Sequence, residues 1–262
     1  MKTVTFGRSL IGAFCLLILV YLLLPVVLIV LLSFSPTRFL DLPFAKASLE
    51  WWRGFASSPS WLMSLGNSLI VASAATVLAA TLGTMAALGL KRLSRRGANI
   101  MRVVFAMPLI TPTVVFAVSA FLTYAPLGLA GSYLGLIIAH TAIGTPLIVL
   151  TVSAVLEGYD EQLSRAAWSL GASRFTTFRL VTFPVIFNGV LSGSFFVFAL
   201  SLDEVVISSF LAGPEQRTLP LRLFSGIKDG DSPVMAVAAT ILIVLSLAFT
   251  MTMHLLSRKK TR

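Results

Sequence analysis

Two adjacent carboxylates, Asp203 and Glu204, lie within a long apolar stretch of the sequence, ALSLDEVVISSFLAGP. Charged side chains at membrane depth are energetically expensive and usually mark a pathway or a binding site. Two neighbouring carboxylates can hold an organic cation through charge-assisted hydrogen bonds. The alternative is an ordinary helix end at the outer membrane surface. Because further apolar residues follow the pair before Gly213, we also expect that the helix can break here.

A second polar candidate is His140, which lies in the apolar stretch AHTAIGTPLIVLTV. Its imidazole can line a pathway and titrate near neutral pH. The alternative, and the more common role of a polar side chain in a helical membrane bundle, is a hydrogen bond to a neighbouring helix. The sequence shows no Ser-His-Asp set and no His, Asp and Glu cluster with metal-ligand spacing. We therefore expect neither catalytic residues nor a metal site.

These residues lie in a chain whose composition is typical of a membrane protein. Of its 262 residues, 57% are hydrophobic and 11% are charged, whereas soluble domains are about 45–50% apolar and about 25% charged. A charged fraction this small excludes a soluble enzyme. The high proportion of apolar residues excludes a disordered chain. The net charge of +10 comes from basic residues scattered between apolar runs, so no nucleic-acid partner is expected.

Six apolar stretches are long enough to cross a bilayer as helices, which takes about 20 residues each. We therefore expect an all-α, polytopic membrane helical bundle in contact with lipid. With both termini in the cytoplasm, the inner segments carry more than twice as many Lys and Arg residues as the outer ones, as the positive-inside rule requires. Pro108 and Pro112 predict a kink in the third stretch, and Asn67 and Ser68 are expected to cap the second. The stretches are 10–34, 66–90, 103–124, 133–156, 185–212 and 234–256.

The expected organisation has three parts. Residues 1–64 hold the first transmembrane helix and an outer loop, whose tryptophans predict a short interfacial helix. Residues 65–256 form a core of five transmembrane helices and include a cytoplasmic loop, residues 157–184. Residues 257–262 form a basic cytoplasmic tail.

The 157–184 loop is too long for a simple turn, and its pattern predicts two short helices. Asp160 is a good N-cap, Gly171 suits the left-handed residue that ends a helix, and Ser173 can cap a second helix. Leu163, Ala167 and Leu170 then lie on one narrow apolar face. Such a face either packs against the chain's own bundle or docks into a groove of a partner protein.

The same loop resembles the signature loop of the permease subunits of binding-protein-dependent ABC importers. Ala166, Ala167 and Gly171 match the start of that motif. After nine intervening residues, Val181, Thr182, Phe183 and Pro184 match its end, with conservative replacements at the two hydrophobic positions. Arg165 stands where the family usually has Glu. The resemblance implies that the loop couples the chain to a separate ATPase, through Arg165, Ala166, Ala167, Gly171, Ala172, Ser173 and Pro184.

Wider similarity connects the chain with the second membrane subunit of the spermidine/putrescine branch of these importers. The stretches that carry it are 202–208, 218–233 and 139–152. The resemblance implies a type I importer permease fold in the bacterial inner membrane. The implied partners are a second permease, an ATPase dimer that binds ATP and Mg, and a periplasmic substrate-binding protein. The implied substrate is a polyamine or a related organic cation, which would pass Asp203, Glu204 and His140.

The chain itself has no G-x-x-x-x-G-K-[ST] motif, so we expect it to be a transport subunit without ATPase activity and without its own cofactor. Similar permeases handle opines, other amino compounds, ferric iron or phosphonates, and these solutes remain alternatives. A secondary transporter that works without ATP is a further alternative. Such a carrier should show interrupted helices at corresponding positions in two halves, and no matching half is evident.

Overall fold

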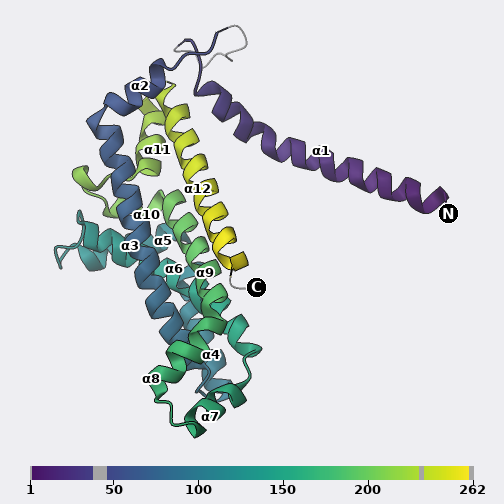
Figure 1. Ribbon diagram of the computed structural model, residues 1–262. Helices are drawn as coiled ribbons and strands as arrows, with labels where there is room; N and C mark the ends of the chain where they lie inside the picture. Colours follow the sequence, from purple (N-terminus) through teal and green to yellow (C-terminus); the bar gives the residue numbers. More distant parts are fainter. Residues whose placement is uncertain (1, 38–45, 230–232, 260–262) are drawn as a thin grey trace. The chain divides into compact units, whose positions relative to one another are not determined.

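The computed structural model describes residues 2–37, 46–229 and 233–259, and every regular element in these ranges is a helix (Figure 1). The chain divides into two compact units. One contains Met1–Leu62 and Ser225–Val244, and the other contains Met63–Phe224 and Leu245–Arg262. The elements are α1 (Lys2–Leu32), α2 (Glu50–Ser57), α3 (Pro59–Leu90), α4 (Arg95–Ile110), α5 (Thr113–Tyr124), α6 (Tyr133–Glu157), α7 (Glu161–Ser169), α8 (Arg174–Thr177), the π-helix η1 (Phe178–Thr182), α9 (Phe183–Asp203), α10 (Val206–Leu211), the 3-10 helix η2 (Pro214–Gln216), α11 (Leu219–Asp229) and α12 (Val234–Lys259).

Five stretches of helix are long and apolar enough to cross a membrane, and a bent pair, α4 with α5, supplies a sixth if it counts as one span. The five correspond to the first, second, fourth, fifth and sixth predicted stretches. They are Ile11–Leu32, Pro59–Leu90, Tyr133–Glu157, Arg174–Asp203 and Val234–Thr252.

The third predicted stretch is divided where the sequence predicted only a kink. α4 ends at Ile110, α5 begins at Thr113, and the two axes differ by 96°. Pro112 disfavours helical geometry at the residue before it, and Thr111 is extended, with φ −67° and ψ 132°. Pro108 stays inside α4. Beyond the break the two halves have different partners, because α4 packs against α6 and α5 packs against α10.

The centre of the second unit is the pair α6 and α9, which make the most extensive helix contact in the described chain. Small residues allow the two backbones to approach closely. A Cβ atom on Gly144 of α6 would lie 2.6 Å from Val197 Cγ1, and one on Gly189 of α9 would lie 2.9 Å from Val155 Cγ2. Two apolar clusters surround this contact, one of them joining α5, α6 and α10.

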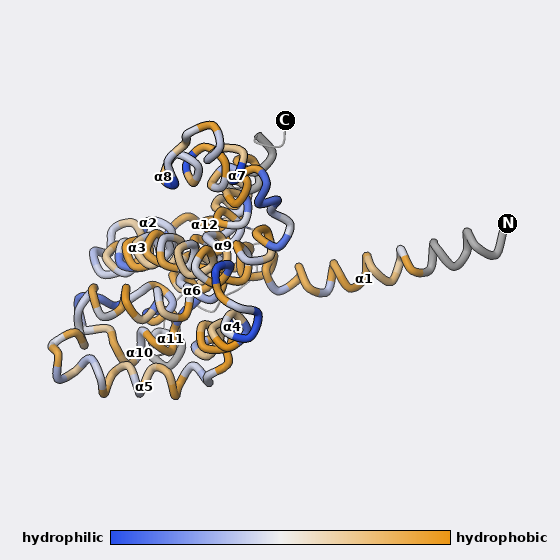
Figure 2. The backbone as a smooth tube through the Cα atoms, turned by 90° about the horizontal axis from the view of Figure 1, so that it is seen from below, coloured by the Kyte–Doolittle hydropathy of each residue, from blue (hydrophilic) through white to orange (hydrophobic). Residues whose placement is uncertain are grey.

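In the first unit, α2 confirms the short helix predicted in the outer loop. Phe55 is buried on one of its faces, and Trp52 stacks on Phe34 with ring centroids 5.7 Å apart. The indole Nε1 of Trp51 donates a hydrogen bond to the Ser35 carbonyl at 3.0 Å. Figure 2 shows apolar colours along most of α1, and the most apolar window of this helix has no buried residue.

The last described element is α12, and Lys259 is its last described residue. Residues 260–262 of the predicted basic tail lie outside the described residues.

Candidate functional site

The 157–184 loop contains the two short helices that the sequence predicted, α7 and α8, and both have side-chain caps. The carboxylate of Asp160 accepts a hydrogen bond from the Gln162 amide at 2.9 Å. The hydroxyl of Ser173 accepts one from the Thr176 amide at 3.1 Å. These bonds satisfy amide groups that the first turn of a helix leaves without partners.

A glycine-dependent C-cap ends α7, as predicted. Gly171 has φ +83°, a left-handed conformation that glycine adopts without strain. The Gly171 amide donates to the Trp168 carbonyl at 2.9 Å, and the Ala172 amide donates to the Ala167 carbonyl at 3.0 Å. This pair of bonds is the Schellman motif. The Ala172 amide therefore stabilises the bend between α7 and α8.

The outward side of this bend is apolar and open. Leu170 is 89% exposed, Phe175 is 72% exposed and Leu163 is 50% exposed. Ala166 is exposed and Ala167 is half-buried. The predicted apolar face therefore exists. Its large side chains are not covered by the described part of the chain's own bundle.

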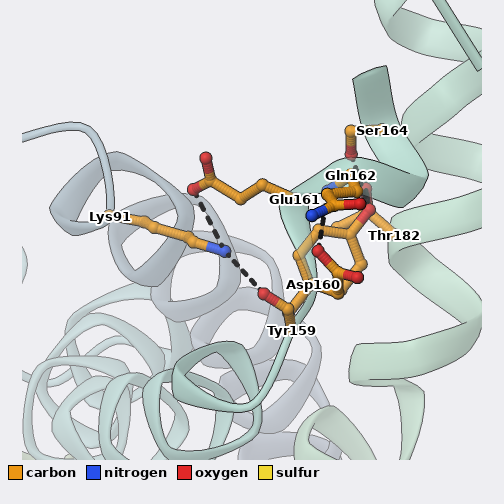
Figure 3. A network of polar contacts seen from close by, with 7 residues as sticks. All are labelled: Lys91, Tyr159, Asp160, Glu161, Gln162, Ser164 and Thr182. Carbon is orange, nitrogen blue, oxygen red and sulfur yellow. Dashed lines mark hydrogen bonds and ion pairs between the residues drawn. The ribbon is translucent and has the colours of Figure 1, made fainter. Parts of the chain in front are cut away.

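A polar network connects α7 to Lys91, directly after α3, and to Thr182 at the end of η1 (Figure 3). The ammonium of Lys91 lies 3.4 Å from Glu161 and 4.6 Å from the centroid of the Tyr159 ring. The Tyr159 hydroxyl lies 2.6 Å from the Ser164 hydroxyl and 3.3 Å from that of Thr182. One side chain, Tyr159, thus connects three elements of the site.

Sequence reasoning assigned Tyr159 no role, although it directly precedes the predicted N-cap. Lys91 is one of the basic residues of the predicted inner segments that the positive-inside rule counts. Lys91 and Tyr159 are 68 positions apart in the chain. Because local patterns cover only neighbouring residues, none of them indicates this contact.

Two further loop residues predicted to be functional are Arg165 and Pro184. Arg165 is exposed on α7, and no ion pair joins it to another described residue. Pro184 is the second residue of α9. This helix begins directly after the π-helix Phe178–Thr182. A proline has no amide hydrogen and its ring displaces the carbonyl four residues earlier. The wider π turn, in which the Phe183 amide donates to Phe178, accommodates this local irregularity.

At the other end of α9, the helix does break at the carboxylate pair. Asp203 is the last residue of α9, and Glu204 is extended, with φ −76° and ψ 112°. The Glu204 carboxylate accepts a hydrogen bond from the Ile207 amide at 2.8 Å, within the first turn of α10. Asp203 is exposed and Glu204 is half-buried. One carboxylate therefore caps a helix, and its neighbour is open.

His140 makes a hydrogen bond to a neighbouring helix, which is one of the two roles predicted for it. Its imidazole is 1% exposed, and Nδ1 lies 2.7 Å from the hydroxyl of Ser201 on α9. The other ring nitrogen, Nε2, has no hydrogen-bond partner among the described residues. Ser201 lies two residues before Asp203, so His140 joins α6 to the part of α9 that precedes the break.

The structure does not gather the predicted residues into one site. Arg174–Asp203 is a continuous 30-residue helical stretch, about 45 Å long at 1.5 Å per residue. The 157–184 loop lies at its beginning, and the carboxylate pair lies at its end. The chain therefore presents two separate candidate sites that share one helix.

Asn67 and Ser68 are not the helix caps that the sequence predicted. α3 begins at Pro59, so both residues lie inside the helix. The Asn67 amide donates to the carbonyls of Glu215 and Arg217, at 2.8 and 3.0 Å. The Ser68 hydroxyl accepts from the amide of Leu219 at 2.8 Å. These side chains hold the segment that follows α10.

No group of three or more His, Cys, Asp and Glu residues that could hold a metal ion occurs in the ranges described. The two candidate sites offer an exposed apolar face and a pair of carboxylates.

Comparison with known proteins identifies the family of the chain. Residues 79–262 match the family described as the binding-protein-dependent transport system inner membrane component. The chain belongs to this family. The expected membership is thus confirmed, and the chain is a membrane component of a transport system.

Two relatives in this permease family cover most of the chain. The spermidine/putrescine transport system permease protein PotC of Escherichia coli (strain K12) is 33% identical over 256 residues, which are 98% of this chain and 97% of PotC. The putrescine transport system permease protein PotI of the same strain is 31% identical over 230 residues, covering 85% and 82% of the two chains.

A solved structure confirms the expected importer permease fold. A bacterial alginate ABC transporter, in complex with an alginate pentasaccharide-bound periplasmic protein, contains a chain with a TM-score of 0.76 to this one. The match covers 100% of this chain and 96% of that chain, at 14% sequence identity. This likeness establishes that this chain has the all-α fold of an importer permease.

Proposed function

We propose that this permease forms half of the membrane pathway of an ATP-driven importer for polyamines such as spermidine and putrescine. Its partners are a second permease, two copies of an ATPase and a periplasmic substrate-binding protein. The assembly lies in the bacterial inner membrane, with both termini of this chain in the cytoplasm.

The observation that carries the proposal is the full-length similarity to PotC, a spermidine/putrescine permease, which covers 98% of this chain. PotI, a putrescine permease, supports the same substrate class at 31% identity. Polyamines are organic cations, and the chain places Asp203 and Glu204 at a break between two helices. Carboxylates at such a break can hold an ammonium group by charge-assisted hydrogen bonds.

The exposed face of the 157–184 loop supports the coupling to an ATPase. Leu170 and Phe175 stay 89% and 72% exposed, and a docking helix in a partner's groove buries such side chains. Closure of the ATPase dimer on ATP would move the two docked loops together. The permease pair would then pass from an inward-open to an outward-open state, because the partner binds the two states unequally.

The direct test is transport in proteoliposomes. The chain is co-purified with its ATPase, second permease and binding protein, and uptake of labelled spermidine is measured with and without ATP inside. We expect uptake only with ATP. Uptake that continues without the ATPase would support the secondary transporter instead. ATP-dependent uptake of ferric iron or a phosphonate, with none of spermidine, would contradict the polyamine assignment.

The carboxylate pair is tested by the double substitution Asp203→Asn and Glu204→Gln, with Glu215→Gln as the matched control. Glu215 is an exposed acidic residue of η2, outside the break. The double variant should lose at least about 90% of spermidine uptake, because a charge-assisted bond contributes about 1.5–3 kcal/mol. Equal uptake by the double variant and the control would remove the carboxylates from the pathway.

The docking face is tested by Leu170→Ser, with Leu127→Ser as its control. Both leucines are well exposed, at 89% and 66%, so neither change should disturb folding. Only Leu170→Ser should reduce copurification of the ATPase, because Leu127 lies in the turn before α6. Unchanged copurification with Leu170→Ser would contradict the docking role of this face.

A further inference from the structure

A cavity of about 500 Å³ lies beneath the 157–184 loop, and neither the family nor the proposed transport role assigns a use to it. Its walls come from the end of α3, from the residues that follow α6, from α7 and from the stretch α8–η1. Tyr159, Glu161, Ser164 and Thr182 of the network in Figure 3 form part of the lining.

The ionisable groups around this cavity are strongly unbalanced in charge. Four basic side chains line it, those of Lys91, Arg92, Arg165 and Arg174, against one acidic side chain, that of Glu161. Glu161 is already paired with Lys91 at 3.4 Å. No ion pair involving the three arginines occurs among the residues that the structure describes. Arg92, Arg165 and Arg174 are exposed residues that line one cavity, and none of them has a counter-charge within the described chain.

The rest of the lining adds both apolar surface and hydroxyl groups. Leu88, Leu156, Trp168 and Phe178 supply the apolar part, and the hydroxyl-bearing residues Ser164 and Thr182 also line the cavity. Ligand sites commonly have volumes of about 300–1,000 Å³, with mostly apolar walls and a few well-placed polar groups. A cavity of this size and composition can hold a phosphate group alone or a phosphate that carries an organic group.

We propose that this cavity binds a phosphate group, held by Arg92, Arg165 and Arg174. Guanidinium groups recognise phosphate oxygens with paired, charge-assisted hydrogen bonds, and arginine is over-represented where such recognition occurs. The phosphate is either the headgroup of an anionic phospholipid or a free phosphate from solution. Basic pockets between transmembrane helices at the membrane surface are known to hold anionic headgroups.

Bound phosphate would also stabilise the loop against the bundle. Arg165 and Arg174 lie on α7 and α8, whereas Arg92 is the second residue after α3. An anion that contacts all three would connect both short helices of the loop to α3, in addition to the Lys91–Glu161 pair. The site therefore provides a way for lipid composition or phosphate concentration to alter how firmly the loop is held.

Direct binding to the full chain tests the proposal and does not depend on transport. Radiolabelled inorganic phosphate is equilibrated with the detergent-purified protein, and native mass spectrometry measures retention of phosphatidylglycerol against phosphatidylcholine. The variants are Arg92→Gln and Arg174→Gln, and the control is Arg96→Gln, a nearby arginine that is absent from the cavity lining. Each variant should weaken binding about 10-fold or more, because one charged hydrogen bond is lost, while the control should bind like the unmodified chain.

The two measurements distinguish the source of the phosphate. Saturable binding of inorganic phosphate that both variants weaken supports a soluble ligand. Selective retention of phosphatidylglycerol that both variants abolish, without binding of inorganic phosphate, supports a lipid ligand. Absence of both, or equal loss in Arg96→Gln, overturns the proposal. Arg92→Lys separates misfolding from loss of the site, because it keeps the charge and should retain part of the binding.

Discussion

Removing one hydroxyl group from Tyr159 should loosen the 157–184 loop without unfolding the chain. The change Tyr159→Phe removes the contacts to Ser164 at 2.6 Å and to Thr182 at 3.3 Å. It leaves the aromatic ring under Lys91 and the Lys91–Glu161 pair in place. A hydrogen bond contributes about 0.5–1.5 kcal/mol net. Because one of the two contacts is long, the combined loss should be about 1–2 kcal/mol, which changes a local equilibrium about 5–30-fold.

Hydrogen–deuterium exchange measures this change directly. Amides of residues 160–182 should exchange about 5–30-fold faster in Tyr159→Phe, since local opening sets the exchange rate of protected amides. The matched control is Tyr133→Phe, at the other end of α6, which loses a hydrogen bond of 2.7 Å to Asn67. The control should leave the exchange of residues 160–182 unchanged.

The same pair of variants tests the link from loop to transport. In the reconstituted importer, Tyr159→Phe should lower the number of polyamine molecules transported per ATP hydrolysed, whereas Tyr133→Phe should keep that ratio. Unchanged exchange in Tyr159→Phe, or equal changes at residues 160–182 in both variants, would refute the role of Tyr159 as the connecting residue.

Three further substitutions follow from the packing and caps described above. Gly171→Ala, at φ +83°, should destabilise the bend by about 1 kcal/mol and lower ATPase copurification, whereas Gly158→Ala, at φ −89°, should not. Gly144→Ala places a Cβ atom 2.6 Å from Val197 Cγ1 and should lower the thermal unfolding midpoint in detergent; combining it with Val197→Ala should restore most of the loss. Asn67→Ala removes two donors to backbone carbonyls and should make residues 213–218 more sensitive to limited proteolysis, and equal cleavage rates would contradict the anchoring role of this amide.

Local features of the 157–184 loop could be predicted because each one depends on a few neighbouring residues. The caps at Asp160 and Ser173 and the left-handed Gly171 depend only on side-chain chemistry within one helical turn. The apolar face of α7 follows from helical spacing in the same way. Burial is different, because it depends on which surfaces the rest of the chain covers.

The break between α4 and α5 could be predicted only in part. Pro112 indicated a disturbance of the helix, but a proline kink and a 96° break start from the same local geometry. The direction of α5 after the break depends on its packing against α10. That packing involves residues about 90 positions further along the chain, which local patterns do not encode.

The misassignment of Asn67 and Ser68 has a similar cause. Polar residues that precede an apolar run favour helix caps, yet their partners here lie 148 to 151 residues away. A signal for the true helix start was present in Pro59, because proline is favoured at the first helical position. The helix indeed begins there.

The π-helix Phe178–Thr182 sets the rotational phase between the two short helices and α9. In an α-helix each residue turns the chain by about 100°, and a π turn takes up one extra residue. Deleting a single residue from this segment would therefore remove the extra residue, convert the segment to regular α-helix and leave Phe175 on nearly the same side of α9. Between the glycine bend and Pro184, the loss of one residue should for this reason be tolerated better than the insertion of a second extra one.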